Sequence, residues 1–284
     1  MSEESKKLSK GTLFICATPI GNLADASFRL VDTLKKVKLI AAEDTRTTRK
    51  LLAHYGIGNK KLTSYHDFSS KNKAGQISDY LNQGTDIALV SESGMPAIQD
   101  PGYELIKMCI ENDLPVKVIP GPNAALSALV LSGLPTDSFL FLGFLPKSSG
   151  KRKAKLQEIK NMPYTLIFYE SPNRAAGFLK DFKDIIGDRE ICLVREMTKI
   201  YEEAIRGKVT HVLSVIQKKR LKGEVVLVSQ GCRERLIKKF TTQEIKDRLM
   251  FLLAEGLSKR EAMKIIRLKY DIDRQKLYNI STKI

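Results

Sequence analysis

The sequence predicts an α/β fold built from two successive α/β domains and a small C-terminal helical domain. Short apolar runs rich in β-branched residues alternate with amphipathic stretches as far as Ser229, which indicates strands connected by helices. Two prolines flank a glycine at residues 120–122 and interrupt this alternation near its middle. From Thr241 onward there is no convincing strand. We therefore expect an N-terminal α/β domain over 11–120, a second α/β domain over 121–232 and a basic helical domain over 241–284.

In the first half, four apolar runs are short enough to be buried strands of a largely parallel sheet. They are Thr12–Ala17 (TLFICA), Leu39–Ala42, Ile87–Ser91 and Val116–Ile119. Two stretches between them carry apolar residues at helical spacing, namely Asp25–Lys36, with Phe28, Val31 and Leu34, and Pro101–Asn112, with Leu105, Met108 and Cys109.

The second half shows the same alternation of strands and helices and ends in a segment that is predicted to be helical. The expected strands are Phe139–Phe144, Thr165–Tyr169, Ile191–Arg195 and Val225–Ser229, and the expected helices are Pro172–Ile186 and His211–Lys219. In the tail we expect helices over Thr242–Ala254 and Ser258–Tyr270 and a third from Asp273. Ser258 is expected to cap its helix together with Glu261, three residues on.

Composition points to a polyanionic partner and gives no support for a membrane span or a metal site. The chain has 284 residues and a net charge of +16, which favours RNA, DNA or an anionic membrane surface as partner. Residues 233–284 alone carry 14 basic and 7 acidic side chains. No apolar run approaches the roughly 20 residues of a membrane span, and the polar start lacks the core of a signal peptide. We expect a cytoplasmic protein with reduced thiols and no metal site, because its four cysteines lie far apart and its three histidines are scattered.

Basic residues also gather at 147–160, with six positive and one negative side chain, and at 218–222. Neither cluster has interleaved aromatic residues, so base stacking is not indicated there. Phosphate contact is the functional interpretation, and a solvated surface is the alternative.

Four polar loops follow the expected strands, where ligands bind in open α/β sheets. They are Thr18–Asn22, Glu43–Arg46, Ser91–Pro96 and Pro120–Ala124. The first has one glycine and matches neither a dinucleotide-binding G-x-G-x-x-G nor a Walker loop. Together the four loops predict a cleft at one edge of the sheet, although each could be an ordinary strand-to-helix turn.

The motifs in these loops occur in one order and spacing. They are TPIGNLAD, AAEDTR, ALVSESGMP followed by QDPGY, PGPNA, GFLP, FYESPNR and REMTK, between about Leu13 and Ser229. In this combination the chain resembles the bacterial cytidine 2′-O-methyltransferases of small-subunit (16S) ribosomal RNA, within the tetrapyrrole-methylase superfamily. The C-terminal LSKREAMKIIRLKYDIDRQKLY resembles the helical tail of that family. The chain departs from the usual pattern at Glu92 and Met95 (SESGMP for SDAGTP), Asn123 and Asn173.

The resemblance implies a two-domain tetrapyrrole-methylase fold, a homodimer, ribosomal RNA as partner and S-adenosyl-L-methionine as cofactor in the trough between the domains. By position, the cofactor-binding residues would be Ser91, Glu92, Ser93, Gly94, Ile98, Pro120, Gly121, Pro122, Asn123, Ala124 and Tyr169.

Methyl transfer to a ribose hydroxyl needs aligned reactants and a group that takes the hydroxyl proton. Carboxylates or a lysine in the motif loops are the candidates, namely Glu43, Asp44, Glu196 and Lys199. Arg46 and Arg174 are candidates for holding substrate phosphates. For each of these residues a structural ion pair is the alternative.

Two other functions remain open at this stage. A small-molecule methylase acting on a tetrapyrrole would have the same fold, but it would not need the basic tail. An RNA-binding or ribosome-assembly factor with lost or altered methylase activity is suggested by the departures in SESGMP.

Overall fold

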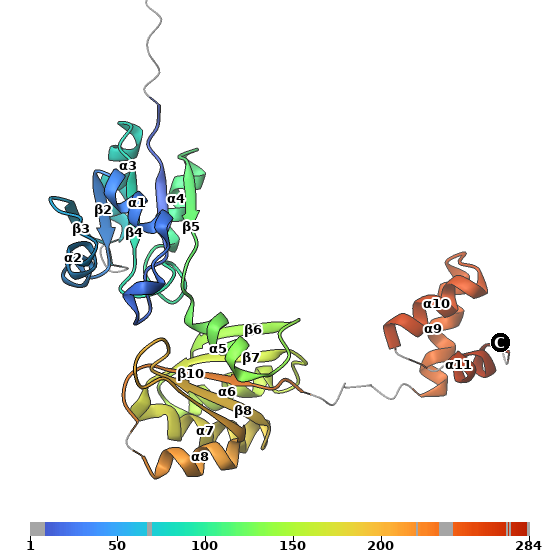
Figure 1. Ribbon diagram of the computed structural model, residues 1–284. Helices are drawn as coiled ribbons and strands as arrows, with labels where there is room; N and C mark the ends of the chain where they lie inside the picture. The colour runs from blue at the N-terminus through green and yellow to red at the C-terminus, as the bar shows by residue number, and fades with distance from the viewer. Residues whose placement is uncertain are drawn as a thin grey trace, which may run out of the picture. The chain divides into compact units, whose positions relative to one another are not determined.

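The computed structural model describes residues 9–66, 70–219, 221–232, 241–270, 272 and 274–282. These residues form two compact units (Figure 1). The first contains the described parts of 1–160 and 164–230, and the second contains those of 161–163 and 231–284.

The first sheet of the larger unit is entirely parallel. Its strands are β1 (Leu13–Cys16), β2 (Leu39–Ala42), β3 (Lys61–Ser64), β4 (Ile87–Val90) and β5 (Val116–Ile119), in the order β3-β2-β4-β1-β5. Every residue of β2 and β4 is buried, because helices cover both faces of the sheet. Helices α1 (Phe28–Lys36) and α2 (Thr45–His54) pack on one face, and α3 (Ser70–Asn82) and α4 (Tyr103–Glu111) pack on the other. A short 3-10 helix, η1 (Leu23–Asp25), precedes α1.

The second sheet is mixed. Its strands are β6 (Phe139–Phe144), β7 (Thr165–Glu170), β8 (Glu190–Arg195), β9 (Glu203–Lys208) and β10 (Val225–Ser229), in the order β6-β7-β10-β8-β9. Only β6 and β7 pair in parallel, and the other three pairs are antiparallel. Helix α5 (Ala124–Ser132) covers one face, and α6 (Ser149–Ile159), α7 (Pro172–Ile186) and α8 (Val209–Gln217) cover the other (Figure 1).

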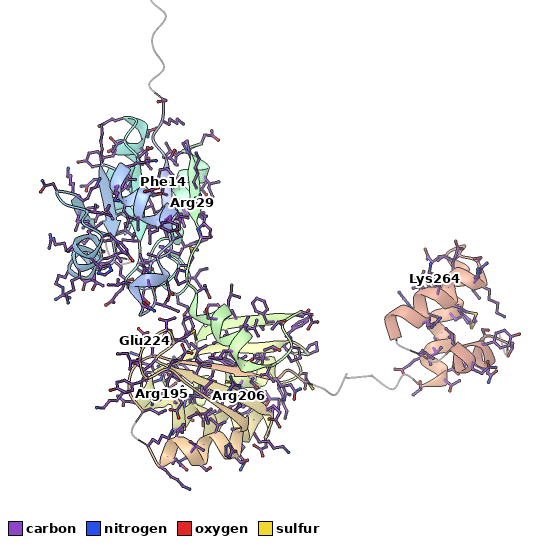
Figure 2. All side chains as sticks on the ribbon, viewed as in Figure 1. Phe14, Arg29, Arg195, Arg206, Glu224 and Lys264 are labelled. Atoms are coloured by element: carbon purple, nitrogen blue, oxygen red, sulfur yellow. The ribbon has the colours of Figure 1, made fainter. Side chains whose placement is uncertain are left out.

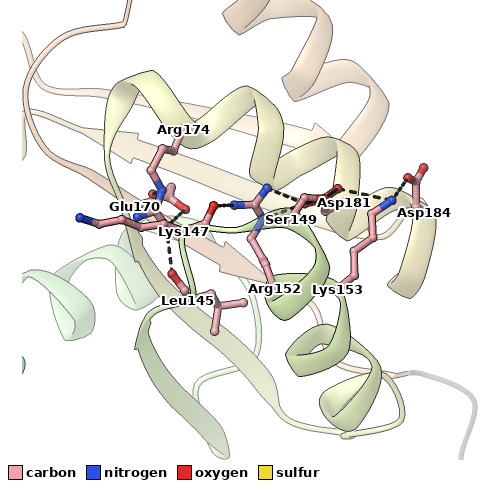
Figure 3. A network of polar contacts seen from close by, with 9 residues as sticks. All are labelled: Leu145, Lys147, Ser149, Arg152, Lys153, Glu170, Arg174, Asp181 and Asp184. Atoms are coloured by element: carbon pink, nitrogen blue, oxygen red, sulfur yellow. Dashed lines mark hydrogen bonds and ion pairs between the residues drawn. The ribbon is translucent and has the colours of Figure 1, made fainter.

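A buried ion pair fixes α6 to α7 (Figure 3). The Arg152 guanidinium donates to Asp181, with 2.8 Å from Nε to Oδ2, and also to the carbonyl of Lys147. Ser149 and Lys153 contact the same carboxylate, and Lys153 also pairs with Asp184. The basic cluster at 147–160 is therefore only partly available to a partner, because its central arginine is buried and charge-compensated.

The smaller unit contains α9 (Thr242–Ala254), α10 (Lys259–Tyr270) and α11 (Arg274–Ser281), which pack around an apolar core that includes Leu249, Ile266 and Leu277. The expected cap of the second tail helix is confirmed, since Ser258 accepts from the Glu261 amide and the Glu261 carboxylate accepts from the Ser258 amide. Lys264 lies on α10 (Figure 2).

Some local expectations were wrong. Helix α1 begins after Ser27, so Leu30 and Leu34 face the core, while Phe28 is 92% exposed. Strands β3 and β9 were missed because they are edge strands with polar sequences, KLTS and EAIRGK. Within the described ranges, no helix is both long and apolar enough to cross a membrane. The same residues include no group of three or more histidine, cysteine or acidic side chains placed to hold a metal ion.

Candidate active site

The register of the first sheet brings the polar loops together. Ala42 and Cys16 both pair with Val90, and Cys16 also pairs with Ile119, so β1, β2, β4 and β5 end side by side. Backbone hydrogen bonds continue the sheet by one residue, from the Glu43 amide to the Val90 carbonyl (3.2 Å) and from the Ala17 amide to the Ile119 carbonyl (3.1 Å). All four loops therefore start from one edge of the sheet.

The loop after β4 is tied to its neighbours by its backbone. Thr18 and Gly94 exchange two hydrogen bonds, of 2.9 and 3.1 Å. The Glu92 amide donates to Oε2 of Glu43 at 3.1 Å. Gly94 has φ = 81°, a conformation in which any side chain is strained. The glycine is therefore required by the loop itself, independently of any ligand.

Two adjacent pockets open at this edge. The first, called here the apolar pocket, has a volume of about 320 Å³ and takes walls from both sheets, including Ile20, Ile98, Val194, Met197 and Val226. The second, the polar pocket, has about 440 Å³ and is lined by hydroxyl and charged side chains that include Thr18, Glu43, Lys50, Ser91 and Lys199. Four residues line both pockets: Ile20, Ser93, Asp100 and Glu224.

The loop between β8 and β9 closes one side of the polar pocket. Nζ of Lys199 lies 3.1 Å from Oε1 of Glu196 and 3.4 Å from Oε2 of Glu224. Burial lowers the pKa of Lys199, but the two carboxylates outweigh it and the net shift is upward. Lys199 therefore stays protonated at neutral pH and is a poor proton acceptor.

Backbone strain gathers around the two pockets. Glu196 and Thr198 have φ of 50° and 64°, and Ala97 and Gln99 have φ of 68° and 65°. Such conformations cost about 1–3 kcal/mol each and persist only where surrounding contacts hold them. At Gln99 that contact is a hydrogen bond from the Phe144 amide, 3.3 Å long, which joins the loop after β4 to the end of β6.

The structure distributes the predicted cofactor residues unevenly. Ser93, Gly94, Ile98, Asn123, Ala124 and Tyr169 line the apolar pocket, whereas Ser91 and Glu92 line the polar one. Pro120, Gly121 and Pro122 line neither of these pockets. At Gly121 a Cβ would lie 3.1 Å from that of Ala17, so packing against β1 accounts for the missing side chain. Asn123 also caps α5, since its side chain accepts from the Leu126 amide.

Of the four residues predicted as catalytic, Glu43 and Lys199 line the polar pocket, and Asp44 and Glu196 line neither pocket. Asp44 caps α2 by accepting from the Arg46 amide, and its carboxylate pairs with the Arg46 side chain at 2.8 Å. These bonds hold the pKa of Asp44 well below its usual range. Such a carboxylate takes up a proton poorly.

The two arginines predicted to hold phosphates are both in ion pairs. Arg46 pairs with Asp44 on the surface. Arg174 lies 2.9 Å from the buried carboxylate of Glu170 and donates to the Leu145 carbonyl at 2.9 Å (Figure 3). Arg174 therefore neutralises Glu170 at the end of β7, next to the apolar pocket.

Asp100 and Glu224 were missed among the site residues. Glu224 lies directly before β10 (Figure 2), which runs antiparallel to β7 and β8. The start of β10 therefore meets the ends of its two neighbours, while the sequence interpretation considered only residues that follow strands. Asp100 belongs to the QDPGY motif and could have been found from that signal.

Three comparisons place the chain among known proteins. A family model described as Tetrapyrrole (Corrin/Porphyrin) Methylases matches residues 12–213. The chain is 43% identical over 274 residues to the Ribosomal RNA small subunit methyltransferase I of Halalkalibacterium halodurans, covering 95% of this chain and 94% of that protein. It is 38% identical over 277 residues to the protein of that name from Bacillus subtilis, covering 96% of this chain and 94% of that protein. A Thermotoga maritima relative of the same name is 43% identical over 221 residues, which cover 78% of this chain and 99% of that protein.

Solved structures agree at the level of the fold. The uroporphyrin-III C-methyl transferase of Thermus thermophilus, complexed with S-adenyl homocysteine, superposes with a TM-score of 0.55 at 16% identity, covering 81% of this chain and 100% of that one. A diphthine synthase superposes with a TM-score of 0.61 at 10% identity, covering 78% of this chain and 89% of that one. The expected fold class is confirmed. The chain belongs to the ribosomal RNA small subunit methyltransferase I family of tetrapyrrole methylases, and it is a methyltransferase.

Proposed function

We propose that this protein transfers the methyl group of S-adenosyl-L-methionine to the ribose 2′-hydroxyl of a cytidine in small-subunit (16S) ribosomal RNA. The observation that carries the proposal is the contact between an apolar and a polar pocket across Asp100 and Glu224. Two reactants held in such neighbouring sites can align for an in-line displacement. The relatives' names and the net charge of +16 support ribosomal RNA as the substrate.

The apolar pocket fits the methyl donor. Its volume of about 320 Å³ lies at the lower end of the roughly 300–1,000 Å³ of small-molecule sites. Its walls are largely aliphatic, aromatic and thioether side chains, which suits the apolar surroundings expected of a sulfonium methyl donor. When bound, S-adenosyl-L-methionine supplies an activated methyl group whose leaving group is neutral. We propose that Ser93, Gly94, Ile98, Asn123, Ala124 and Tyr169 hold it.

The protein's own groups have two tasks in the reaction. They must exclude water and orient the donor and the ribose, which the strained loops around Gln99 and Thr198 are placed to do. They must also accept the hydroxyl proton. We propose Asp100 for this step, because it borders both pockets, between the site proposed for the donor and the site proposed for the ribose. Roles for Glu43, Asp44, Glu196 and Lys199 as proton acceptors, and for Arg46 and Arg174 as phosphate ligands, stay predictions.

We also propose that the protein is a cytoplasmic homodimer. Each chain would have three domains, at residues 11–120, 121–232 and 241–284. Large apolar side chains on the surface, such as Val130 at 75% exposure, support self-association. Sedimentation of the purified protein tests this, and a monomer at micromolar concentration would exclude it.

The decisive experiment is mass spectrometry of small-subunit ribosomal RNA from cells with and without the gene. Loss of one ribose methylation on a cytidine is the expected result, and restoration by the wild-type gene is the control. An unchanged methylation pattern would contradict the proposal. Two further measurements test the alternatives. An RNA-binding factor that has lost cofactor binding would show no heat in calorimetry with S-adenosyl-L-methionine. A tetrapyrrole methylase would bind the donor in that experiment but would not methylate RNA.

A further inference from the structure

Thr18, a residue that lines the polar pocket, has a buried hydroxyl without a partner among the described residues. Thr18 is 3% exposed, and its Oγ1 makes no hydrogen bond to any described residue. A buried hydroxyl without a partner costs about 1–3 kcal/mol. Thr48, which also lines the pocket, differs in this respect, because the Thr48 hydroxyl donates to the Asp44 carbonyl at 2.9 Å. The orphan hydroxyl therefore marks a place where a ligand atom is expected.

The carboxylate of Glu43 lines the same pocket, and one of its two oxygens accepts a hydrogen bond. Oε2 of Glu43 accepts from the Glu92 amide, which fixes the side chain over the loop after β4. Oε1 of Glu43 has no hydrogen bond in the part of the chain that the structure describes. Lys50, on the next turns of α2, lines the pocket and is exposed. A hydroxyl, a carboxylate acceptor and an exposed ammonium thus converge on one cavity of about 440 Å³.

This set of groups matches one class of ligand. A pyrimidine nucleotide presents the O2 carbonyl as an acceptor, a phosphate for an ammonium and, in cytosine only, a 4-amino group that donates. Carboxylates are the side chains that accept from the cytosine amino group, while uracil presents a carbonyl there and is repelled. A base that enters a protein pocket must leave the base stack, which costs least where the RNA is single-stranded.

Resting on the function proposed above, we propose that the polar pocket receives the target cytidine of the ribosomal RNA, swung out of its stack. The Thr18 hydroxyl donates to the O2 carbonyl, and Oε1 of Glu43 accepts from the 4-amino group. Lys50 holds the phosphate at the mouth of the pocket. Glu43 is then a specificity residue that reads the base, and proton acceptance is left to Asp100 at the border with the apolar pocket.

The first test measures binding without catalysis. The full-length chain is saturated with S-adenosylhomocysteine and titrated with cytidine 5′-monophosphate or uridine 5′-monophosphate by nuclear magnetic resonance. We expect cytidylate to bind about tenfold more tightly than uridylate. Glu43→Gln keeps the bond to the Glu92 amide through its amide oxygen but can donate to uracil, so it should remove or reverse this preference. Equal binding of the two nucleotides to the wild type would overturn the inference, and so would competition of cytidylate with S-adenosylhomocysteine.

Thr18 supplies an independent test, because O2 is common to both bases. Thr18→Val should weaken both nucleotides by about fivefold to tenfold and leave their ratio unchanged. Thr18→Ser should keep the wild-type affinity. Thr48→Val is the matched control, since its hydroxyl is already used by α2, and it should change nucleotide affinity by less than about twofold. A loss as large in Thr48→Val as in Thr18→Val would overturn the role of Thr18.

The second measurement separates this inference from the proposed function. Methyl transfer is assayed on small-subunit RNA carrying cytidine or uridine at the target position. We expect the wild type to prefer cytidine about tenfold in kcat/KM and Glu43→Gln to lose that preference. An equal fall of kcat on both RNAs in Glu43→Gln would overturn base reading and make Glu43 the proton acceptor. Cytidylate binding with the expected pattern but no methyl transfer to any ribosomal RNA would support the pocket and contradict the proposed function.

Discussion

Lys199 lies directly across Gly21, so that a Cβ at Gly21 would stand 2.7 Å from Cγ and 2.9 Å from Cε of the lysine. This approach joins the loop after β1 to the loop after β8, and Lys199 continues from there to Glu196 and Glu224. The wall of the polar pocket therefore depends on the absence of a side chain at Gly21.

Gly21→Ala should displace Lys199 and disturb the site. The added methyl group meets the lysine stem and the Thr198 hydroxyl, and φ at Gly21 is +157°. We expect a fall in the free energy of unfolding of about 1–3 kcal/mol and a loss of methyl transfer of tenfold or more, about 1.4 kcal/mol. Gly58→Ala is the control, because a Cβ there meets no atom within 4 Å. Equal activity of the two variants in an RNA methylation assay would show that the contact is dispensable.

Asp100→Asn should lower kcat and leave donor binding nearly intact. If Asp100 accepts the hydroxyl proton, its removal costs about 100-fold to 10,000-fold in kcat. The measurements are single-turnover methyl transfer and calorimetry with S-adenosyl-L-methionine. Glu111→Gln, on the surface of α4 and 3.9 Å from Lys107, serves as control. A normal kcat in Asp100→Asn would move the role to another carboxylate, with Glu224 first.

The pH dependence should distinguish Lys199 from a proton acceptor. The pKa of Lys199 is raised, so its ion pairs are fully present below the unfolded value of about 10.4 and are lost only as the pH rises through the higher folded value. We expect the wild type and Lys199→Arg to have the same pH–rate profile between about pH 6 and 9. A rate that rises with an apparent pKa of about 8 in the wild type, and not in Lys199→Arg, would contradict this.

Asp181→Asn should destabilise the second α/β half strongly. It leaves the Arg152 charge buried without a counter-ion, and breaking such a pair costs about 3–5 kcal/mol. Asp184→Asn is the matched control, because Asp184 also pairs with Lys153 but lies on the surface, where the cost is below about 1 kcal/mol. Urea unfolding measures both, and equal midpoints would show that the buried pair contributes little.

The same pair predicts acid sensitivity. Burial raises the pKa of Asp181, but hydrogen bonds from Arg152 and Ser149 outweigh it, and the net shift is downward. Its contribution to stability is present above the unfolded value of about 3.9 and is lost as the pH falls through the lower folded value. The difference in stability between wild type and Asp181→Asn should therefore narrow below about pH 4.

Deleting residues 241–284 should leave cofactor binding nearly intact and weaken RNA methylation. The residues of both pockets lie between Thr18 and Val226, and the tail helices have a core of their own. The match to the Thermotoga maritima relative covers 99% of that protein but only 78% of this chain. A protein of that name therefore exists that is shorter than this chain by about the length of the deleted segment. Donor affinity, oligomeric state and RNA methylation are compared in one truncated preparation. Full RNA methylation would exclude the tail from substrate binding, and aggregation would assign it a structural role.

Features that depend on neighbouring residues and on periodicity can be predicted from the sequence alone. Buried strands such as β4, the bounds of α7 at Pro172 and Ile186, and the reciprocal cap between Ser258 and Glu261 follow from local propensity and periodicity. The order and spacing of the motifs were sufficient to predict the fold class and the methylase family, because the motifs resemble those of one family in that order.

Which polar side chains line the two pockets follows from the tertiary structure. Glu224 lines both pockets because β10 runs antiparallel to its neighbours. Asp44 lines neither pocket, and its carboxylate is bound to Arg46 and to the start of α2. Arg152 belongs to the basic cluster at 147–160, for which phosphate contact was the functional interpretation, but it is buried against Asp181, 29 residues away in sequence. Such partners are set by sheet register and helix packing over long sequence separations, and a local pattern contains no information about them.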